Sequence, residues 1–331
     1  MNQIFTTLVT LFALTFSFHV IAQEAPKSLF RLEYNSDKTS DKLERSEIKV
    51  YSLLPRTDLS WPYTDEFQNS NHLGIDLQAY ARSTESVKIN GQRAAGVFGK
   101  KYSQDLYLEA LAGIHSVKSE EPTLAQTVFN YELKIQSWLA DNLFIQVTTI
   151  KDLIYQELVT AQVDEKLSYN EVNPLIIYTP IKEVRIINRD KFRILSDKNK
   201  KQEFDLAAMY GLYTSTPWVW VGMGYNQINF SKEKNQVGYW APEKFKAYGL
   251  RAEMNVPVNN ELPLQLIFNA VYNHQQEENF EWGEGSIINV GFNYGDRAAQ
   301  KFSMAYNEIR SRQSNSQWVQ ATWNLQYQES F

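Results

Sequence analysis

Apolar and polar side chains alternate one residue at a time through most of this chain beyond residue 26. The last segment shows the pattern best: odd positions from Val319 to Tyr327 are apolar or aromatic, and even positions from Gln320 to Gln328 are polar. Successive side chains of a β-strand point to opposite faces of a sheet, so a period of two predicts strands with one apolar and one polar face. We therefore expect an all-β protein.

The same alternation recurs in four other segments, with apolar rows over residues 73–81, 129–135, 204–212 and 262–272. The chain is 43% hydrophobic and 14% aromatic, yet its mean hydropathy is negative. Its apolar residues are therefore interleaved with polar ones, and they do not form the long runs that transmembrane helices need.

About 16 segments of this kind can be placed, and tight connections alternate with longer ones between them. Outer-membrane barrels alternate short periplasmic turns with long external loops, whereas soluble sandwiches have no reason to do so. We predict a transmembrane antiparallel β-barrel of about 16 strands, within a range of about 14 to 18. The expected strands start near Ser28, Arg45, His72, Ala94, Asp105, Ala125, Asn142, Asn170, Lys182, Lys201, Trp218, Lys244, Leu262, Glu284, Ala299 and Ser316.

Two connections depart from this alternation. Ser196 to Lys200 is short for an external loop, and Pro55 to Asn69 is long for a periplasmic turn, where a misplaced pair of strands is the alternative. The connections expected to be long and external are Glu85 to Arg93, Lys118 to Leu124, Asp152 to Tyr169, Ser231 to Glu243 and Gln275 to Gly283.

The N-terminus carries a stretch without charged residues from Ile4 to Ala22, which ends in a small-residue site. It predicts a signal peptide over residues 1–22, followed by one barrel domain over residues 23–331. A retained membrane anchor is the alternative, because no Lys or Arg precedes the apolar stretch. An even strand number places both termini in the periplasm. Phe331 resembles the C-terminal assembly signal of outer-membrane barrels, although Glu329 departs from that signal. The expected partners are outer-membrane lipid and the barrel-assembly machinery.

Composition excludes several other classes of protein. The chain has no Cys, which excludes disulfides and thiolate metal sites, and a net charge of −5 without basic runs argues against nucleic-acid binding. No catalytic or phosphate-binding motif occurs, and the adjacent His115 and Ser116 fall on opposite strand faces. We predict no catalytic residues, no metal, no cofactor and no enzymatic activity.

The polar faces of the strands would line the lumen of such a barrel. A barrel near 16 strands is wide enough for an aqueous channel, and charges placed there need water or partners. Aromatic residues such as Tyr80, Tyr107 and Tyr213 beside mixed charges would suit a hydrated carbohydrate. The predicted lumen residues are Asp76, Arg82, Glu109, Glu132, Lys134, Asp205, Arg251 and Glu253.

Two further segments resemble the C-terminal barrels of exopolysaccharide export proteins, those for cellulose and poly-N-acetylglucosamine. One is a turn with Ser196, Asp197 and Asn199, in which Lys198 replaces the usual glycine of the family. The other follows about 40 residues later, with the same order and separation as in the family, and contains Tyr239, Trp240 and Pro242. The family carries a periplasmic helical-repeat scaffold ahead of its barrel. The resemblance therefore implies either a separate periplasmic scaffold protein as partner or a barrel that serves another task.

Three functions are compatible with these features. The first is an outer-membrane channel that passes or guides an exopolysaccharide, neutral or weakly cationic because of the acidic balance, with Tyr239 and Trp240 at the external rim. The second is a general porin for small solutes. The third is a surface receptor, adhesin or enzyme that acts through external loops such as Asp152 to Tyr169.

Overall fold

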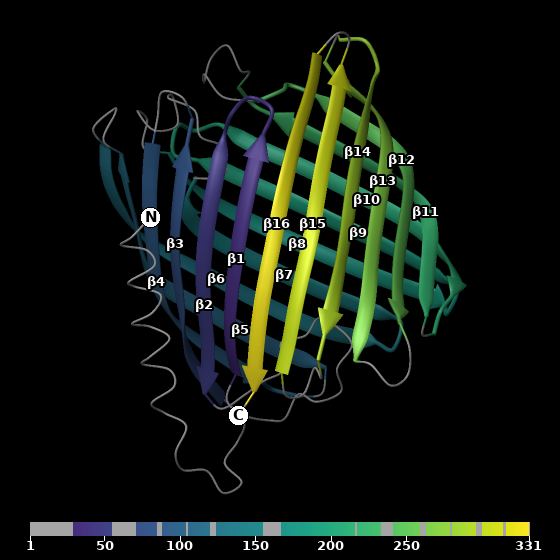
Figure 1. Cartoon of the computed structure of the whole chain (residues 1–331), viewed down its shortest axis with the longest axis horizontal. Helices are drawn as coiled ribbons and strands as arrows, with labels where there is room; N and C mark the ends of the chain where they lie inside the picture. Colours follow the sequence, from purple (N-terminus) through teal and green to yellow (C-terminus); the bar gives the residue numbers. More distant parts are fainter. Residues whose placement is uncertain are drawn as a thin grey trace, which may run out of the picture.

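The computed structural model of the protein is a closed barrel of sixteen antiparallel strands, which confirms the predicted fold class (Figure 1). Each strand pairs with its neighbours in sequence, and β1 pairs with β16 to close the barrel. The structure describes residues 29–54, 71–84, 88–103, 105–119, 124–154, 167–215, 217–232, 241–258, 263–278, 280–295, 300–313 and 316–330.

The strands are long. A membrane-spanning strand needs roughly 9 to 11 residues, so most of these strands are long enough to extend beyond a bilayer. Their bounds are β1 Leu29–Thr39, β2 Glu44–Leu54, β3 Asn71–Ser83, β4 Lys88–Lys101, β5 Leu106–Ser119, β6 Leu124–Ala140, β7 Leu143–Leu153, β8 Ser168–Ile181, β9 Val184–Leu195, β10 Lys200–Tyr213, β11 Trp218–Phe230, β12 Phe245–Pro257, β13 Leu264–Glu277, β14 Gly283–Tyr294, β15 Gln300–Gln313 and β16 Ser316–Ser330.

Every strand starts within one or two residues of its predicted start except β4. Its predicted start was Ala94, but β4 begins at Lys88, so most of the loop predicted over Glu85 to Arg93 is strand. The reason is that Lys88, Asn90 and Gln92 are the exposed outward residues of this part of β4. A polar outer face does not show the apolar alternation on which the prediction depended.

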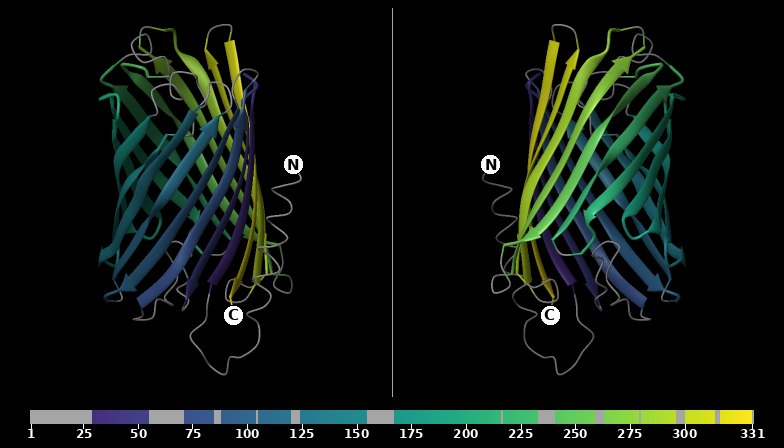
Figure 2. Two further views of the ribbon diagram at one scale, coloured as in Figure 1. Left: turned by 90° about the vertical axis from the view of Figure 1, so that its left-hand side faces the viewer. Right: turned by 90° about the vertical axis from the view of Figure 1, so that its right-hand side faces the viewer.

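The β1 start and the β16 end lie at one end of the barrel, which we call the terminal rim; the other end is the opposite rim (Figure 2). At the opposite rim the connections over 154–167 and 231–244 are long, as predicted. Those over 84–87 and 120–123 are short, so the predicted alternation of loop lengths is wrong there: the strands extend into the expected loops. The long connection over 55–70 lies outside the described residues, and β2 and β3 pair directly with each other.

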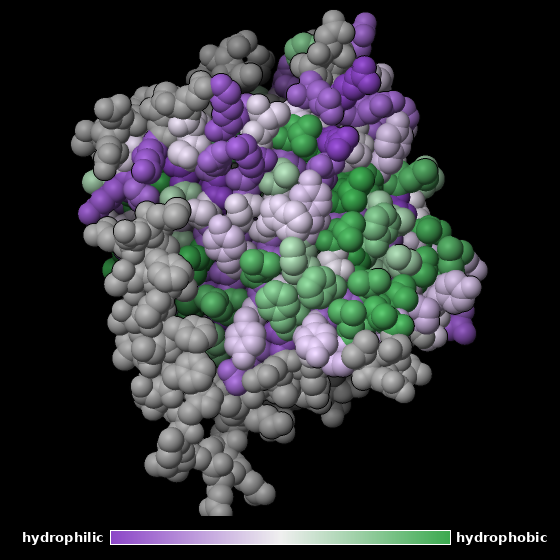
Figure 3. Space-filling model, in the orientation of Figure 1, coloured by the Kyte–Doolittle hydropathy of each residue, from purple (hydrophilic) through white to green (hydrophobic). Residues whose placement is uncertain are grey.

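The outer wall carries an apolar band, part of which is green in Figure 3. Exposed aliphatic side chains form this band, among them Ile75, Ile114, Leu206, Leu250 and Val290. Exposed aromatic side chains lie near both rims. Those near the terminal rim include Tyr102, Tyr178, Tyr213, Tyr294 and Phe302, and those near the opposite rim include Phe129, Phe192, Phe204, Tyr248 and Trp282. An apolar band between two aromatic girdles is the outer surface of a transmembrane barrel.

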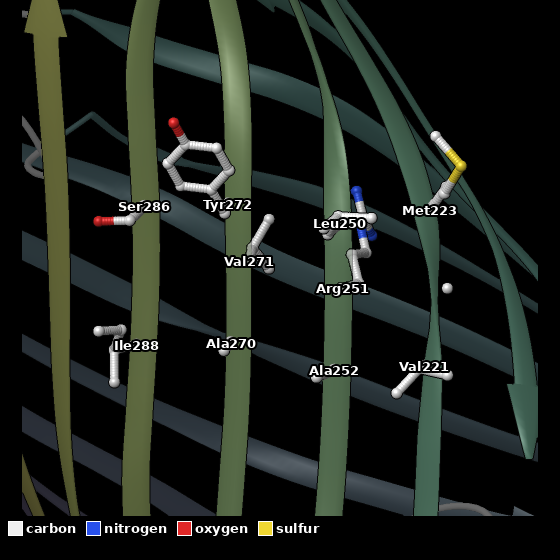
Figure 4. A pocket seen from close by; sticks show the side chains of 11 residues that line it. Val221, Met223, Leu250, Arg251, Ala252, Ala270, Val271, Tyr272, Ser286 and Ile288 are labelled. Atoms are coloured by element: carbon white, nitrogen blue, oxygen red, sulfur yellow. The ribbon is translucent and has the colours of Figure 1, made fainter. Parts of the chain in front are cut away.

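A shallow apolar groove of about 590 Å³ interrupts this outer wall on β11–β14. Ala252 and Ala270 are cross-strand partners in this groove and lie at one level with Val221 and Ile288, and the larger Leu250 and Tyr272 lie at the next level along the same strands (Figure 4). The depression follows from the small alanine side chains, and it belongs to the membrane-facing surface.

The inner wall is packed unevenly. Tyr80, Tyr107 and His115 on β3 and β5 are at most 4% exposed, and apolar clusters extend along the inner faces of β1–β11. Most inward side chains of β13–β16 are only partly buried. Side chains therefore pack closely on one part of the inner wall and border the lumen more openly on the other.

Candidate functional site: the inner wall of the barrel

The eight predicted lumen residues occupy strand positions whose neighbours in sequence are the outward-facing side chains of the membrane band. Asp76 on β3, for example, lies between Ile75 and Leu77 and is 1% exposed, whereas Ile75 is 48% exposed. The same alternation places the other predicted residues on the inner wall: Arg82, Glu109, Glu132, Lys134, Asp205, Arg251 and Glu253.

Asp76 belongs to a chain of ion pairs along β2–β7. Its carboxylate lies 3.2 Å from Lys49 Nζ and 2.8 Å from Arg93 Nη2. Arg93 Nη1 in turn lies 3.5 Å from Asp152 Oδ2. Asp152 contacts His115, as described below. Two carboxylates therefore share a single guanidinium, and each charge in this row has an opposite charge beside it.

His115 is fully buried between two side chains. Its Nδ1 lies 2.5 Å from Asp152 Oδ1 and its Nε2 lies 2.9 Å from the Tyr80 hydroxyl. Such an arrangement of carboxylate, imidazole and hydroxyl can orient a proton, but His115 is 0% exposed and Tyr80 is 4% exposed. The cluster links β3, β5 and β7 across the inner wall, and we interpret it as packing.

Glu132 and Lys134, both predicted lumen residues, do not pair with each other. Lys134 Nζ lies 2.8 Å from Glu109 Oε1, and the other oxygen of Glu109 accepts hydrogen bonds from Tyr107 and Tyr51. Glu132 makes no side-chain hydrogen bond or ion pair with another described residue. Arg82 is 2% exposed and interacts with Asp37, which also pairs with Arg45 at 2.8 Å.

A second chain of charges follows β8–β12. Asp205 pairs with Arg251, and Arg189 Nη1 lies 3.7 Å from the same carboxylate. Glu253 pairs with Arg185, whose guanidinium also lies 4.5 Å from the centre of the Trp220 ring. The structure therefore joins each predicted acid of this group to a base.

Sequence reasoning missed the basic row on β9. Arg185, Arg189, Lys191 and Arg193 are alternate residues, with one position taken by Ile187, and all face inward. Arg193 Nε lies 2.5 Å from Glu171 on β8. The signal that could have identified this row is the period of two of its basic residues.

Tyr213, expected in the lumen, faces outward instead. A bulge between Gly211 and Tyr213 shifts the register of β10 against β11, and Tyr213 then pairs with Val219, an outward residue. Tyr213 is 63% exposed near the terminal rim. Tyr80 and Tyr107, also expected to contact a carbohydrate, face inward but are buried.

The inner face of β13–β16 differs from the rest of the wall because it is polar and almost uncharged. Among the described side chains that face inward from these four strands, the charged ones are Glu277 and Lys301, each at a strand end. We call the amide and hydroxyl side chains here the amide wall: Gln265, Asn269, Asn273, Gln275, Asn289, Asn293, Ser303, Asn307, Ser311, Gln320, Thr322, Asn324, Gln326 and Gln328.

The turn with Ser196, Asp197 and Asn199 lies at the opposite rim between β9 and β10. Asn199 is 0% exposed. Its Oδ1 accepts hydrogen bonds from the Lys200 and Lys232 amides at 2.9 Å each, and its Nδ2 donates to the Lys232 carbonyl at 3.2 Å. Ser196 Oγ accepts a hydrogen bond from the Ser168 amide at 3.1 Å. Asn199 therefore fastens this turn to the end of β11.

The second segment that resembles the exopolysaccharide export proteins lies beside this turn. Ala241 packs with Leu195 in one apolar cluster, and the Pro242 carbonyl accepts a hydrogen bond from the Phe230 amide at 3.0 Å. Two segments about 40 residues apart in sequence thus meet beside β11 at the opposite rim. Tyr239 and Trp240 lie outside the described residues.

Within the described ranges, no group of three or more His, Cys, Asp or Glu side chains could hold a metal ion. None of the described segments is a helix long and apolar enough to cross a membrane.

Closed strand pairing, an apolar outer band between aromatic girdles and a charged and amide-rich inner wall define a transmembrane β-barrel. No protein-family model matches the chain, and no curated protein matches it. Solved structures do match.

A structure described as a bacterial polysaccharide outer membrane secretin shares a TM-score of 0.71 at 11% identity, over 93% of this chain and 100% of that one. CdiB from Acinetobacter baumannii gives a TM-score of 0.50 at 8% identity, over 91% of this chain and 60% of that one. OccK5 (OpdH) from Pseudomonas aeruginosa gives 0.45 at 11% identity, over 93% and 99%. The match with a TM-score of 0.71 shows that the chain has the fold of an outer-membrane barrel.

Proposed function

We propose that the protein is an outer-membrane channel that passes or guides an exopolysaccharide, neutral or weakly cationic. The observation that carries the proposal is the inner wall: most of its described charges are paired within the wall, and one part of it, over β13–β16, presents uncharged hydrogen-bonding groups. The solved structure that matches with a TM-score of 0.71 is a polysaccharide outer membrane secretin, which supports the same substrate class.

The size of the barrel fits a hydrated solute. Barrels of eight strands are filled by their own side chains, whereas barrels of 16 to 18 strands leave an aqueous channel. Water in that channel hydrates the inward charges and amides. The hydroxyl groups of a sugar polymer can replace this water as hydrogen-bond partners of the wall. Neutral hydrogen bonds contribute only about 0.5 to 1.5 kcal/mol each, so a chain can form them and slide past.

The proposal includes no chemical step. Its proposed partners are the outer-membrane lipid and the barrel-assembly machinery, and a separate periplasmic scaffold protein is a further candidate. The predicted signal peptide over residues 1–22, which lies outside the described residues, would direct the chain to them.

Release of labelled sugars from proteoliposomes tests this function. Vesicles that contain the refolded protein would be loaded with a disaccharide, a hexasaccharide and a dodecasaccharide of 1,4-linked glucose. A polymer channel should release all three, with rates that fall only slowly with length. Release of the disaccharide alone would instead indicate a general porin. No release of any sugar would contradict a sugar channel and favour a function in the external loops.

A further inference from the structure

Three neighbouring strands present one asparagine each at the same level of the amide wall. Asn269 on β13 pairs in register with Asn289 on β14, and Asn289 pairs with Asn307 on β15. Neighbouring strands lie about 4.8 Å apart, so these amides form a row across the wall at that spacing. On the next strand, β16, Thr322 continues the row as the register partner of Asn307.

These three amides are available to a solute. Each side chain is only partly buried, and none of the three makes a side-chain hydrogen bond to another described residue. Their amide atoms are not among the buried side-chain atoms that lack a hydrogen-bond partner, so these amides are accessible. They are therefore directed to the open side of the wall, which in a barrel of this size is the lumen.

Other inward polar groups are already engaged with one another. Gln136 Nε2 donates to Gln146 Oε1 at 2.7 Å on β6 and β7, and Asp205 and Glu253 on the neighbouring wall pair with arginines. A solute that bound to those groups would have to displace a protein partner. The asparagine row carries no such cost.

The chemistry of an amide selects among sugars. An asparagine side chain offers two donors and one acceptor, which matches a hydroxyl group that both donates and accepts. It offers no charge to an ammonium or carboxylate group. An uncharged wall should therefore favour a glycan without ionised groups over a charged one.

We propose that the amide wall, with Asn269, Asn289 and Asn307 at its centre, is the surface along which the polymer passes, and that the polymer is an uncharged glycan. The inference rests on the proposed function and deepens it, since it names both the contact surface and the substrate class.

Block of single-channel current in a planar bilayer tests the inference. The probes are a hexasaccharide of 1,4-linked glucose, which is neutral, and one of 1,4-linked glucosamine, which is cationic. In the wild-type channel the glucose hexasaccharide should block at lower concentration. The variant with Asn269→Ala, Asn289→Ala and Asn307→Ala should need about tenfold more of it for the same block, with open-channel current retained.

The matched control removes two amides that bond to each other, Gln136→Ala with Gln146→Ala, and should leave the block unchanged. If the triple variant does not refold, Asn289→Ala alone should weaken block about threefold. Asn289→Asp keeps the shape and adds a negative charge, so it should strengthen block by the glucosamine probe.

The outcomes separate the two proposals. Sugar block that is equal in the wild type and the triple variant would overturn the amide wall and leave polysaccharide passage standing. Stronger block of the wild type by the glucosamine probe would overturn the uncharged substrate class. A channel indifferent to both probes would overturn the proposed function as well.

Discussion

Lys198 has a backbone φ of 69°, in the left-handed region that favours glycine. The turn thus keeps the geometry that a glycine would adopt, although the side chain of lysine strains it. This conformation costs a non-glycine residue roughly 1 to 2 kcal/mol. A glycine avoids that cost, but it loses more backbone entropy on folding, which offsets about 0.5 to 1 kcal/mol of the gain.

We expect Lys198→Gly to raise the free energy of unfolding by about 0.5 to 1 kcal/mol. Urea unfolding in lipid vesicles would measure the change. Lys200→Gly is the control, because Lys200 is at the start of a strand and should lose stability instead. A Lys198→Gly variant less stable than the wild type would show that the turn does not carry this strain.

Asp205 and Glu253 neutralise three arginines on the inner wall: Arg185, Arg189 and Arg251. Replacement of both acids by alanine leaves those guanidinium groups facing the lumen. The ratio of anion to cation permeability should rise about twofold or more, because charged side chains that line a pore set its selectivity. Reversal potentials in a salt gradient measure the ratio.

Asp190→Ala is the matched control for that experiment. Asp190 lies at an outward position of β9 between the inward Arg189 and Lys191, and its loss should not alter selectivity. Unchanged permeability in the double variant as well would mean that the Asp205 and Glu253 region does not line the conducting path.

The ion-pair partners of single residues could not be predicted from the sequence. The alternation correctly indicated which face of β10 carries Asp205, but the partner of Asp205 depends on register across β10, β11 and β12. Barrel closure determines that register, so Arg251 and Arg189 could not be assigned to Asp205 from the pattern of either strand alone.

The packing of β3 against β4 requires a glycine on β4. Gly91 on β4 is the register partner of Tyr80 on β3, and a Cβ added to Gly91 would lie 1.9 Å from Tyr80 Cζ. The Tyr80 ring therefore lies over the Gly91 backbone, and this position lets its hydroxyl reach His115.

Gly91→Ala should displace the ring and lower the free energy of unfolding by about 1 to 3 kcal/mol, the usual cost of overpacking. Gly96→Ala on the same strand is the control, since an added Cβ there meets no atom within 4 Å. The two variants can be compared by urea unfolding followed by tryptophan fluorescence. Equal stability of the two variants would show that the Tyr80 position does not matter to the packing of these strands.

Asn199 holds the turn between β9 and β10 against the end of β11. Asn199→Ala would remove the hydrogen bonds that Oδ1 accepts from the Lys200 and Lys232 amides, at a cost of about 0.5 to 1.5 kcal/mol for each bond lost. Hydrogen exchange at Lys232 should accelerate, while exchange in the middle of β10 stays unchanged. Asn188→Ala, a change of the same type on the outer face of β9, should not accelerate it.

The errors of the prediction lie near the ends of two strands, β4 and β10. The pattern placed β4 six residues late because outward Lys88, Asn90 and Gln92 are polar, and it placed Tyr213 in the lumen because a bulge leaves no mark in the alternation. The middle of each strand was predictable, since there one face meets lipid and the other meets water.

Across the whole barrel the strand number and the division into two faces could be predicted, because lipid outside and water inside require opposite residues at alternate positions. The uneven inner wall could not. The predicted lumen residues were charged ones such as Asp76 and Glu109, which the structure shows paired with basic residues. The asparagines of β13–β15 carry no charge, so the same criterion did not select them. The part of the wall best suited to an uncharged polymer was therefore overlooked.

The most direct test of the account is the single-channel current of the refolded wild-type protein while a hexasaccharide of 1,4-linked glucose is titrated. We predict a steady open current that the neutral sugar blocks in a concentration-dependent manner. An open current that the sugar leaves unchanged at every concentration would contradict a polysaccharide channel.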